Sequence, residues 1–123
     1  MSAGERLTAT PAGVRLAPVE AIADGGARNF VVQMRAGRFH GFVVRRGDTL
    51  HGYVDRCPHM GLPLAQVLDD YLTPDGTRIA CSWHGALFEV ADGRCVAGPC
   101  GGQRLTPWPV ALVDGYVTTA AAE

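Results

Sequence analysis

The sequence predicts an all-β protein, an antiparallel sandwich or barrel, on three observations. β-rich runs recur roughly every 8 to 12 residues, with turn residues between them. The chain is rich in the residues that tight turns use, with 16 Gly and 8 Pro among 123 residues. No long run has the 3.6-residue period of an amphipathic helix. A chain of this length is usually one domain, so a single domain is expected over residues 1–123.

Several of these runs can be delimited in chain order. Residues 1 to about 12 show no clear period and are expected to form a loose arm. A first strand is expected over 14–19, with Pro18 at its end or on a sheet edge, where a missing amide is tolerated. The further β-rich runs cover residues 28–35, 39–46, 49–54, 78–80, 86–91 and 110–119, and turns are expected at Ala36-Gly37-Arg38 and Pro74-Asp75-Gly76.

The run from Phe39 to Val54 predicts a hairpin whose turn is Gly47-Asp48. Gly in the first of the two turn positions favours a type II′ turn. The resulting register sets three pairs opposite each other: Arg46 and Thr49, Val44 and His51, and Phe42 and Tyr53. The return strand leads directly into Cys57, so a rigid hairpin end is expected to carry the loop that follows.

Two later hairpins are predicted from Asp-Gly pairs. Asp92-Gly93 favours a type I′ turn. That turn would place Ala91 opposite Arg94 and Val90 opposite Cys95, which would make Cys95 a buried strand residue. A last hairpin is expected around Asp114-Gly115 and would close the chain.

Two short motifs carry the chemistry. Cys57-Pro58-His59-Met60-Gly61 and Cys81-Ser82-Trp83-His84-Gly85 each supply one thiol and one imidazole, in C-x-H and C-x-x-H spacing. This division of ligands suits a site with two metal ions, one of which prefers thiolate and the other imidazole. A [2Fe–2S] cluster in which two His replace two Cys on one iron is such a site.

C-P-H-x-G followed by C-x-W-H-G resembles the two ligand motifs of the Rieske iron–sulfur family. Gly98-Pro99 is similar to the third loop, which covers the cluster in that family, and the resemblance runs from about Phe39 to Val110. It implies a Rieske-like antiparallel β-sandwich or barrel with a cluster-binding subdomain of two loops, about 55–65 and 80–101. It also implies a Rieske-type [2Fe–2S] cluster whose metal-binding residues are Cys57, His59, Cys81 and His84.

Two other interpretations of the motifs stay open. A tetrahedral zinc site uses the same ligand types, although zinc fingers usually pair Cys with Cys and His with His, whereas each motif here is mixed. A Cys can also be a small buried hydrophobe and a His an ordinary core residue. Two Gly-terminated motifs followed by a Gly-Pro loop fit that second interpretation poorly.

The resemblance also bears on the reduction potential. The high-potential respiratory type has an extra Cys in each loop, which together form a bracing disulfide, where this chain has Leu62 and Trp83. It has a Ser where this chain has Ala86, and the hydroxyl stabilises the reduced cluster. The chain is similar instead to Rieske ferredoxins and to the N-terminal domains of ring-hydroxylating oxygenases. This implies a potential below zero, in the lower part of the range of about −150 to +300 mV.

Composition narrows the function classes. The net charge is −1, so no strong field attracts nucleic acid or an anionic membrane. No apolar run approaches the ~20 residues of a spanning helix. Residues 1–14 lack the apolar segment of a secretory signal, so a cytoplasmic protein with reduced thiols is expected. Cys95 and Cys100, outside both motifs, are then expected to be neither ligands nor a required disulfide.

The expected function is that of a soluble Rieske-type ferredoxin that passes one electron between redox partners, a reductase and an oxygenase or another acceptor. Two alternatives are a small Rieske subunit of a multi-subunit oxidoreductase, such as a nitrite-reductase-like complex, and a redox-sensing interaction protein. A self-contained enzyme is not favoured. Aromatic-ring oxygenases need a further iron with two His and a carboxylate, and the predicted register does not set His40 opposite His51. No catalytic residue is predicted.

The spacer between the motifs is acidic because it contains Asp69, Asp70 and Asp75. It is interpreted as a solvated loop or as a docking patch for a partner.

Overall fold

The computed structural model describes residues 6–7, 9–56, 64, 69–81, 85–98 and 102–121. Within these ranges the chain consists of β-strands and one short 3-10 helix, η1 (Val19–Ala21), so the all-β prediction is confirmed. The strands are β1 (Arg6–Leu7), β2 (Arg15–Pro18), β3 (Ala27–Met34), β4 (Gly37–Arg46), β5 (Thr49–Val54), β6 (Arg78–Ala80), β7 (Leu87–Glu89), β8 (Cys95–Ala97), β9 (Val110–Val113) and β10 (Tyr116–Thr119).

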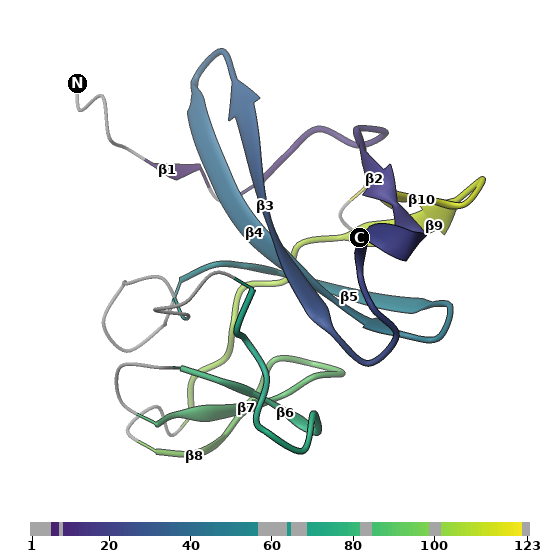
Figure 1. Cartoon of the computed structure of the whole chain (residues 1–123). Helices are drawn as coiled ribbons and strands as arrows, with labels where there is room; N and C mark the ends of the chain where they lie inside the picture. Colours follow the sequence, from purple (N-terminus) through teal and green to yellow (C-terminus); the bar gives the residue numbers. More distant parts are fainter. Residues whose placement is uncertain are drawn as a thin grey trace.

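The strands form three small sheets (Figure 1). The long β3, β4 and β5 cross the middle of the molecule, with β4 between the other two and β1 added in parallel near its start. One three-stranded sheet has the order β2-β10-β9, and the other has the order β6-β7-β8. In Figure 1 these two sheets lie at opposite sides of the central hairpin, and β6-β7-β8 carries the second Cys-His motif.

The predicted register of the central hairpin is confirmed. Three pairs lie opposite each other as expected, namely Arg46 and Thr49, Val44 and His51, and Phe42 and Tyr53. Gly47 has φ +61° and Asp48 is not among the residues with positive φ, which matches a type II′ turn. The preceding turn lies one residue earlier than expected, because Gly37 already pairs with Met34. The turn at 114–115 is also confirmed, with φ +51° at Asp114 and +80° at Gly115.

The predicted register of β7 and β8 is wrong. Cys95 pairs with Phe88, not with Val90, and a loop of four residues separates Glu89 from Arg94. The Gly93 amide donates to the Glu89 carbonyl over 2.9 Å, and Asp92 lacks the positive φ that a type I′ turn requires. Val90 is only 4% exposed and its carbonyl accepts a hydrogen bond from the Tyr53 hydroxyl, so tertiary contacts hold it in the loop and not opposite Cys95.

The expected loose arm is partly fixed. Arg6 and Leu7 form β1 and pair with Arg38 and Phe39. The indole nitrogen of Trp108 donates a 2.8 Å hydrogen bond to the hydroxyl of Thr10. The expectation of a loose arm is therefore wrong for these three positions, since partners nearly a hundred residues away hold the last of them.

Two clusters of buried side chains make up the core. One, around Trp108 and Phe39, lies between the central sheet and the β2-β10-β9 sheet. Two glycines make room for Trp108: a Cβ on Gly41 would lie 2.6 Å from its ring, and one on Gly52 would lie 2.4 Å from its carbonyl oxygen. The other cluster joins the central sheet to β6-β7-β8 and contains Cys81 of the second motif.

Tyr53 connects the central hairpin to the loop before β8. Its side chain is buried, and its hydroxyl donates a 2.6 Å hydrogen bond to the carbonyl of Val90. Burial and then the charge of Asp92 raise the pKa of Tyr53 to about 12, against a smaller opposing effect of Arg104. The stabilisation tied to the protonated phenol is complete below about pH 10 and is lost as the pH rises through about 12.

We expect Tyr53→Phe to lower the free energy of unfolding by about 1 to 3 kcal/mol, because the Val90 carbonyl would stay buried without its donor. A thermal melt of the holoprotein at fixed scan rate measures the effect as a fall in Tm. Tyr116→Phe is the control, since the Tyr116 hydroxyl makes no hydrogen bond within the described residues. Equal melting temperatures for the two variants would contradict the assigned role of Tyr53.

Candidate metal centre

Of the four predicted ligands, the structure describes only Cys81. Cys57, His59 and His84 lie outside the described residues. Cys81 is described: it directly follows β6, and only 1% of its surface is exposed. It belongs to the same buried cluster as Leu64 and Ala86. Leu64, which follows the first motif, and Cys81, which begins the second motif, therefore lie in the same apolar cluster.

The β6–β7 hairpin fixes the two ends of the second motif. The Cys81 amide donates a 2.8 Å hydrogen bond to the Ala86 carbonyl, and the Gly85 amide donates a 3.0 Å bond to the Cys81 carbonyl. Gly85 has φ +69°, a conformation that glycine adopts without steric cost. The backbone at Gly85 and Ala86 therefore lies directly beside Cys81.

Gly98, the first residue of the expected covering loop, lies against the second motif. A Cβ on Gly98 would come within 2.7 Å of the Ala86 Cα, and the residue has φ +92°. The backbone after β8 thus packs directly on the backbone after Gly85. Pro99, the other residue of this motif, lies outside the described residues, as do Leu62 and Trp83.

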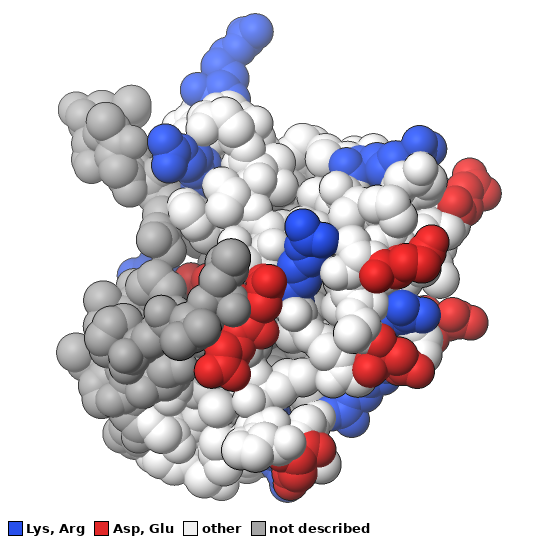
Figure 2. Space-filling model, in the orientation of Figure 1, with Lys and Arg blue, Asp and Glu red and all other residues white. Residues whose placement is uncertain are grey.

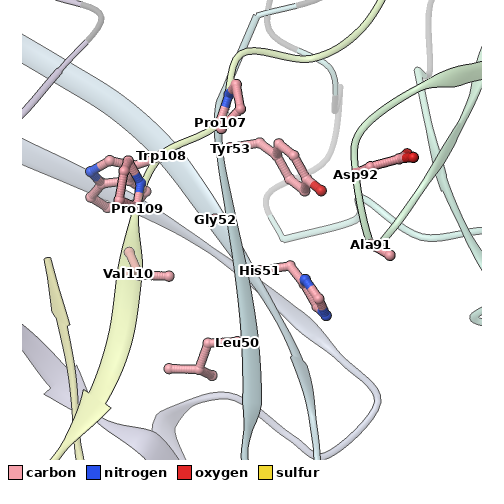
Figure 3. A pocket seen from close by; sticks show the side chains of 10 residues that line it. All are labelled: Leu50, His51, Gly52, Tyr53, Ala91, Asp92, Pro107, Trp108, Pro109 and Val110. Carbon is pink, nitrogen blue, oxygen red and sulfur yellow. The ribbon is translucent and has the colours of Figure 1, made fainter. Parts of the chain in front are cut away.

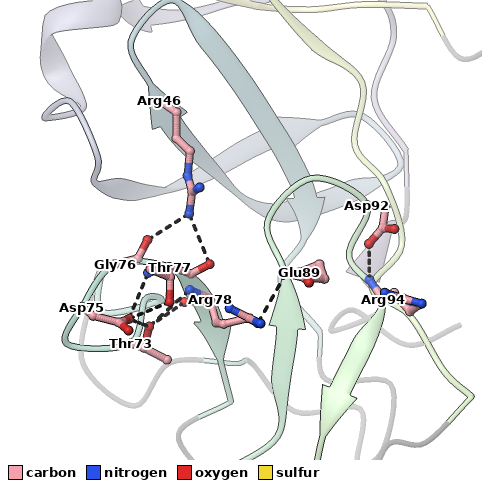
Figure 4. A network of polar contacts seen from close by, with 9 residues as sticks. All are labelled: Arg46, Thr73, Asp75, Gly76, Thr77, Arg78, Glu89, Asp92 and Arg94. Atoms are coloured by element: carbon pink, nitrogen blue, oxygen red, sulfur yellow. Dashed lines mark hydrogen bonds and ion pairs between the residues drawn. The ribbon is translucent and has the colours of Figure 1, made fainter.

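A network of polar contacts holds the turn before β6 (Figure 4). The Arg46 guanidinium donates to the carbonyls of Gly76 and Thr77 over 2.9 and 3.3 Å, which connects the tip of the central hairpin to this turn. Hydrogen bonds from Thr73 and Thr77 lower the pKa of Asp75 to about 2. Arg78 of β6 also pairs with Glu89 of β7 over 3.4 Å. These contacts hold the strand that leads into Cys81.

Two aspartates of the acidic spacer have local roles. Asp75 accepts the hydrogen bonds of the 73–77 turn, and Asp69 accepts a 2.7 Å hydrogen bond from the Asn29 amide of β3. Both contacts are exposed, which agrees with a solvated loop. The alternative, a docking patch for a partner, stays a prediction.

A cavity of about 220 Å³ lies away from Cys81, between β5 and the segments at 91–92 and 107–110 (Figure 3). His51 reaches into this region, and burial followed by the charge of Arg46 lowers its pKa. As predicted, His51 pairs with Val44 and not with His40. Among the described residues no group of three His, Cys, Asp or Glu side chains could hold a metal ion.

The expectation of reduced thiols outside the motifs is wrong for Cys95. Of the two described cysteines, Cys95 is disulfide-bonded and Cys81 is not. The expectation came from the missing export signal, which concerns the compartment and not the distance between sulfurs in the fold. Cys100 lies outside the described residues. That cluster binding does not require the disulfide stays a prediction.

Comparison with known proteins gives the family. A model of the Rieske [2Fe–2S] domain matches residues 14–116, most of the chain. The chain belongs to the Rieske [2Fe–2S] domain family. No curated protein matches it in sequence. Within the described part of this Rieske domain, no helix is both long and apolar enough to cross a membrane.

Solved structures share the fold. The ferredoxin of Sphingomonas yanoikuyae B1 is 25% identical, with a TM-score of 0.66 over 89% of this chain and 99% of its own. A chain of a complex of reduced oxygenase and oxidised ferredoxin in carbazole 1,9a-dioxygenase is 25% identical, with a TM-score of 0.70 over 93% of this chain and 100% of its own. The terminal oxygenase of carbazole 1,9a-dioxygenase from Nocardioides aromaticivorans IC177 is 20% identical, with a TM-score of 0.70 over 94% of this chain but only 32% of its own.

The cofactor of this Rieske domain is a [2Fe–2S] cluster, which takes the place of the zinc interpretation. The residues present fit such a group. Two thiols and two imidazoles stand in the two motifs, as a cluster with His₂ on one iron requires. Cys81 lies in a buried apolar position where thiolate ligands are protected from solvent.

Sequence reasoning missed one buried charged residue beside the first motif. Asp55 follows β5, two positions before Cys57, and is 5% exposed. The signal was present: an acidic residue follows the apolar end of a strand, Tyr53-Val54, directly before the first motif. Its partners could not be read from the sequence, because they lie 9, 16 and 26 positions away.

Proposed function

We propose that this Rieske domain is a one-electron carrier of the ferredoxin type, which receives its electron from a reductase and delivers it to an oxygenase or another redox acceptor. The observation that carries the proposal is the structural match to ferredoxin structures at 25% identity. The chain corresponds to almost the full length of ferredoxins, but to only about a third of a terminal oxygenase.

The proposed ligands are Cys57 and Cys81 on one iron, and His59 and His84 on the other. When bound, the cluster supplies a reversible one-electron couple. The residues around Cys81 exclude water from that ligand and hold its backbone on both sides through Ala86 and Gly85. A rigid ligand loop changes little between redox states, and a small reorganisation favours rapid electron transfer.

The mixed charges on the described surface favour a transient complex over tight binding to a strongly charged partner. Arginine and acidic side chains are interspersed over the face shown in Figure 2, and the net charge of the chain is −1. Without a field of one sign, long-range steering is weak, and association depends on contacts near the cluster. Complexes held by few charged contacts dissociate readily, as a shuttle between two partners requires.

The test is reconstitution of a ferredoxin-dependent oxygenase. Purified reductase and terminal oxygenase of a carbazole dioxygenase are assayed without their own ferredoxin, and the holoprotein is added in its place. We expect coupled substrate oxidation that rises with the amount of holoprotein, and no activity with a Cys81→Ala variant. Voltammetry of the same holoprotein is expected to give a one-electron couple below zero.

Two results would contradict the proposal. One is a holoprotein that takes up an electron from the reductase but does not pass it to any tested acceptor oxygenase. The other is isolation of the chain from its own cells only in a stable complex with a larger subunit, which would favour the small Rieske subunit of an oxidoreductase complex.

A further inference from the structure

Asp55 lies where the first ligand segment leaves the central hairpin. Its side chain is buried, and one carboxylate oxygen accepts a 2.9 Å hydrogen bond from the amide of Leu64. The segment between these two positions contains Cys57 and His59. Leu64 is itself fully buried in the core beside Cys81. The Asp55 carboxylate therefore closes the base of the first ligand segment, as a clamp between the residue before it and the residue after it.

The other carboxylate oxygen connects Asp55 to the second motif. It accepts hydrogen bonds from the Tyr71 hydroxyl over 2.8 Å and from the Asn29 side-chain amide over 3.2 Å. Tyr71 stacks on Phe42 with ring centroids 4.2 Å apart, and its carbonyl accepts a 2.8 Å bond from the amide of Ala80. Ala80 directly precedes Cys81. One buried carboxylate thus holds the backbone beside both motifs.

The geometry of this network places three donors, the Leu64 amide, the Tyr71 hydroxyl and the Asn29 side-chain amide, against the two oxygens of Asp55. Burial and then the charge of Asp55 raise the pKa of Tyr71 far above its ordinary value, so the phenol keeps its proton and donates it. Asn29 donates one amide hydrogen to Asp55 and the other to the Tyr71 oxygen over 2.7 Å. Accepting from three donors is the role of an ionised carboxylate. All three donors are neutral, so they solvate the charge without cancelling it.

We propose that Asp55 is a positioning residue for the iron–sulfur cluster, and that its buried negative charge lowers the reduction potential of the cluster. Reduction adds negative charge, and a nearby negative charge in a region of low dielectric opposes that addition. Net charge and hydrogen bonding around a cluster are the main means by which a protein sets its potential. The inference rests on the proposed ligands, because it takes the cluster to be held by the segments that Asp55 clamps.

Asp55→Asn separates charge from position. The new amide oxygen can still accept from Leu64, but the new amide nitrogen would face the Asn29 nitrogen. If the Asn29 amide turns over, its oxygen accepts from both the Tyr71 hydroxyl and the new amide nitrogen, so the clamp is kept while the charge is lost. We expect the cluster content and visible spectrum of the wild type, with the reduction potential shifted upward in voltammetry. Asp48→Asn is the matched control. It makes the same change of charge at the other end of β5, which is ~20 Å away. Because Asp48 is exposed, salt screens its charge. The reduction potential of the cluster in Asp48→Asn is therefore expected to stay at the wild-type value.

Asp55→Ala removes the clamp as well and is expected to reduce the iron and sulfide content per chain and to speed loss of the visible spectrum. Tyr71→Phe gives an independent measurement should Asp55→Asn fail to hold a cluster. It keeps the charge and removes one donor to it, so its potential is expected to equal or fall below that of the wild type.

Three results would overturn the inference: an Asp55→Asn potential at or below the wild-type value, full cluster content in Asp55→Ala, or a raised potential in Tyr71→Phe. The wild-type spectrum and the Cys81→Ala variant are measured first. If the wild type has no Rieske spectrum, the ligand proposal fails. If it has one and Asp55→Asn does not shift the potential, the role of Asp55 alone fails.

Discussion

Cys81→Ala is expected to abolish the visible and EPR signature of the cluster, with iron and sulfide falling to background. The physical reason is that an iron of a [2Fe–2S] cluster loses a thiolate that no other group at this position can replace. The site is buried, and the described side chains packed around Cys81 are mainly apolar, for example Leu64 and Ala86. Iron and sulfide analysis together with EPR of the dithionite-reduced protein measures the effect.

Cys95→Ser serves as the comparison for this variant. It also removes a cysteine, but one that lies outside both motifs and is bound in a disulfide. We expect it to keep one cluster per chain with an unchanged EPR spectrum. A full cluster in Cys81→Ala would refute the ligand assignment, and loss of the cluster in Cys95→Ser would show that the disulfide is needed to form the site.

Gly98→Ala is expected to have the second large effect, a strong fall in cluster content and in thermal stability. The residue has φ +92°, and an added methyl group would lie 2.7 Å from the Ala86 Cα. The positive φ costs of order 1 to 3 kcal/mol for a residue with a side chain. Crowding against backbone that cannot rotate away adds a similar cost, about 1 to 3 kcal/mol. The sum is a large fraction of the ~5 to 15 kcal/mol that stabilises a typical domain.

Gly102→Ala isolates the contribution of the contact. Gly102 has φ +79°, so alanine meets a similar backbone strain there, but apart from its chain neighbours no atom of the described residues lies within 4 Å of its added Cβ. We expect a full cluster and a fall in Tm that reflects the backbone strain alone, smaller than the fall in Gly98→Ala. Cluster content measured by iron analysis should therefore differ between the two variants. Equal cluster content would mean that the approach of Gly98 to Ala86 does not matter for the site.

The sequence was sufficient for features that depend on neighbouring residues. The hairpin of β4 and β5 was predicted to the register because Gly47-Asp48 selects a two-residue turn, and every later pair follows from it. The two motifs were recognisable because Cys and His at short spacing within one loop carry their chemistry with them. Strand β6 was predicted with the residues that it has, since Pro74-Asp75-Gly76 precedes it and the second motif follows.

Tertiary packing decided what depends on residues far apart in the chain. The loop between β7 and β8 has four residues because the core takes up Val90 and the Tyr53 hydroxyl holds its carbonyl, although Asp92-Gly93 alone favours a tighter turn. The connection from Asp55 through Tyr71 to Ala80 likewise exists only when the central sheet and the β6-β7-β8 sheet are packed together. Local preferences of the chain amount to about 1 kcal/mol per residue. A buried side chain or a buried hydrogen bond matches or exceeds that amount, and so packing determined these contacts.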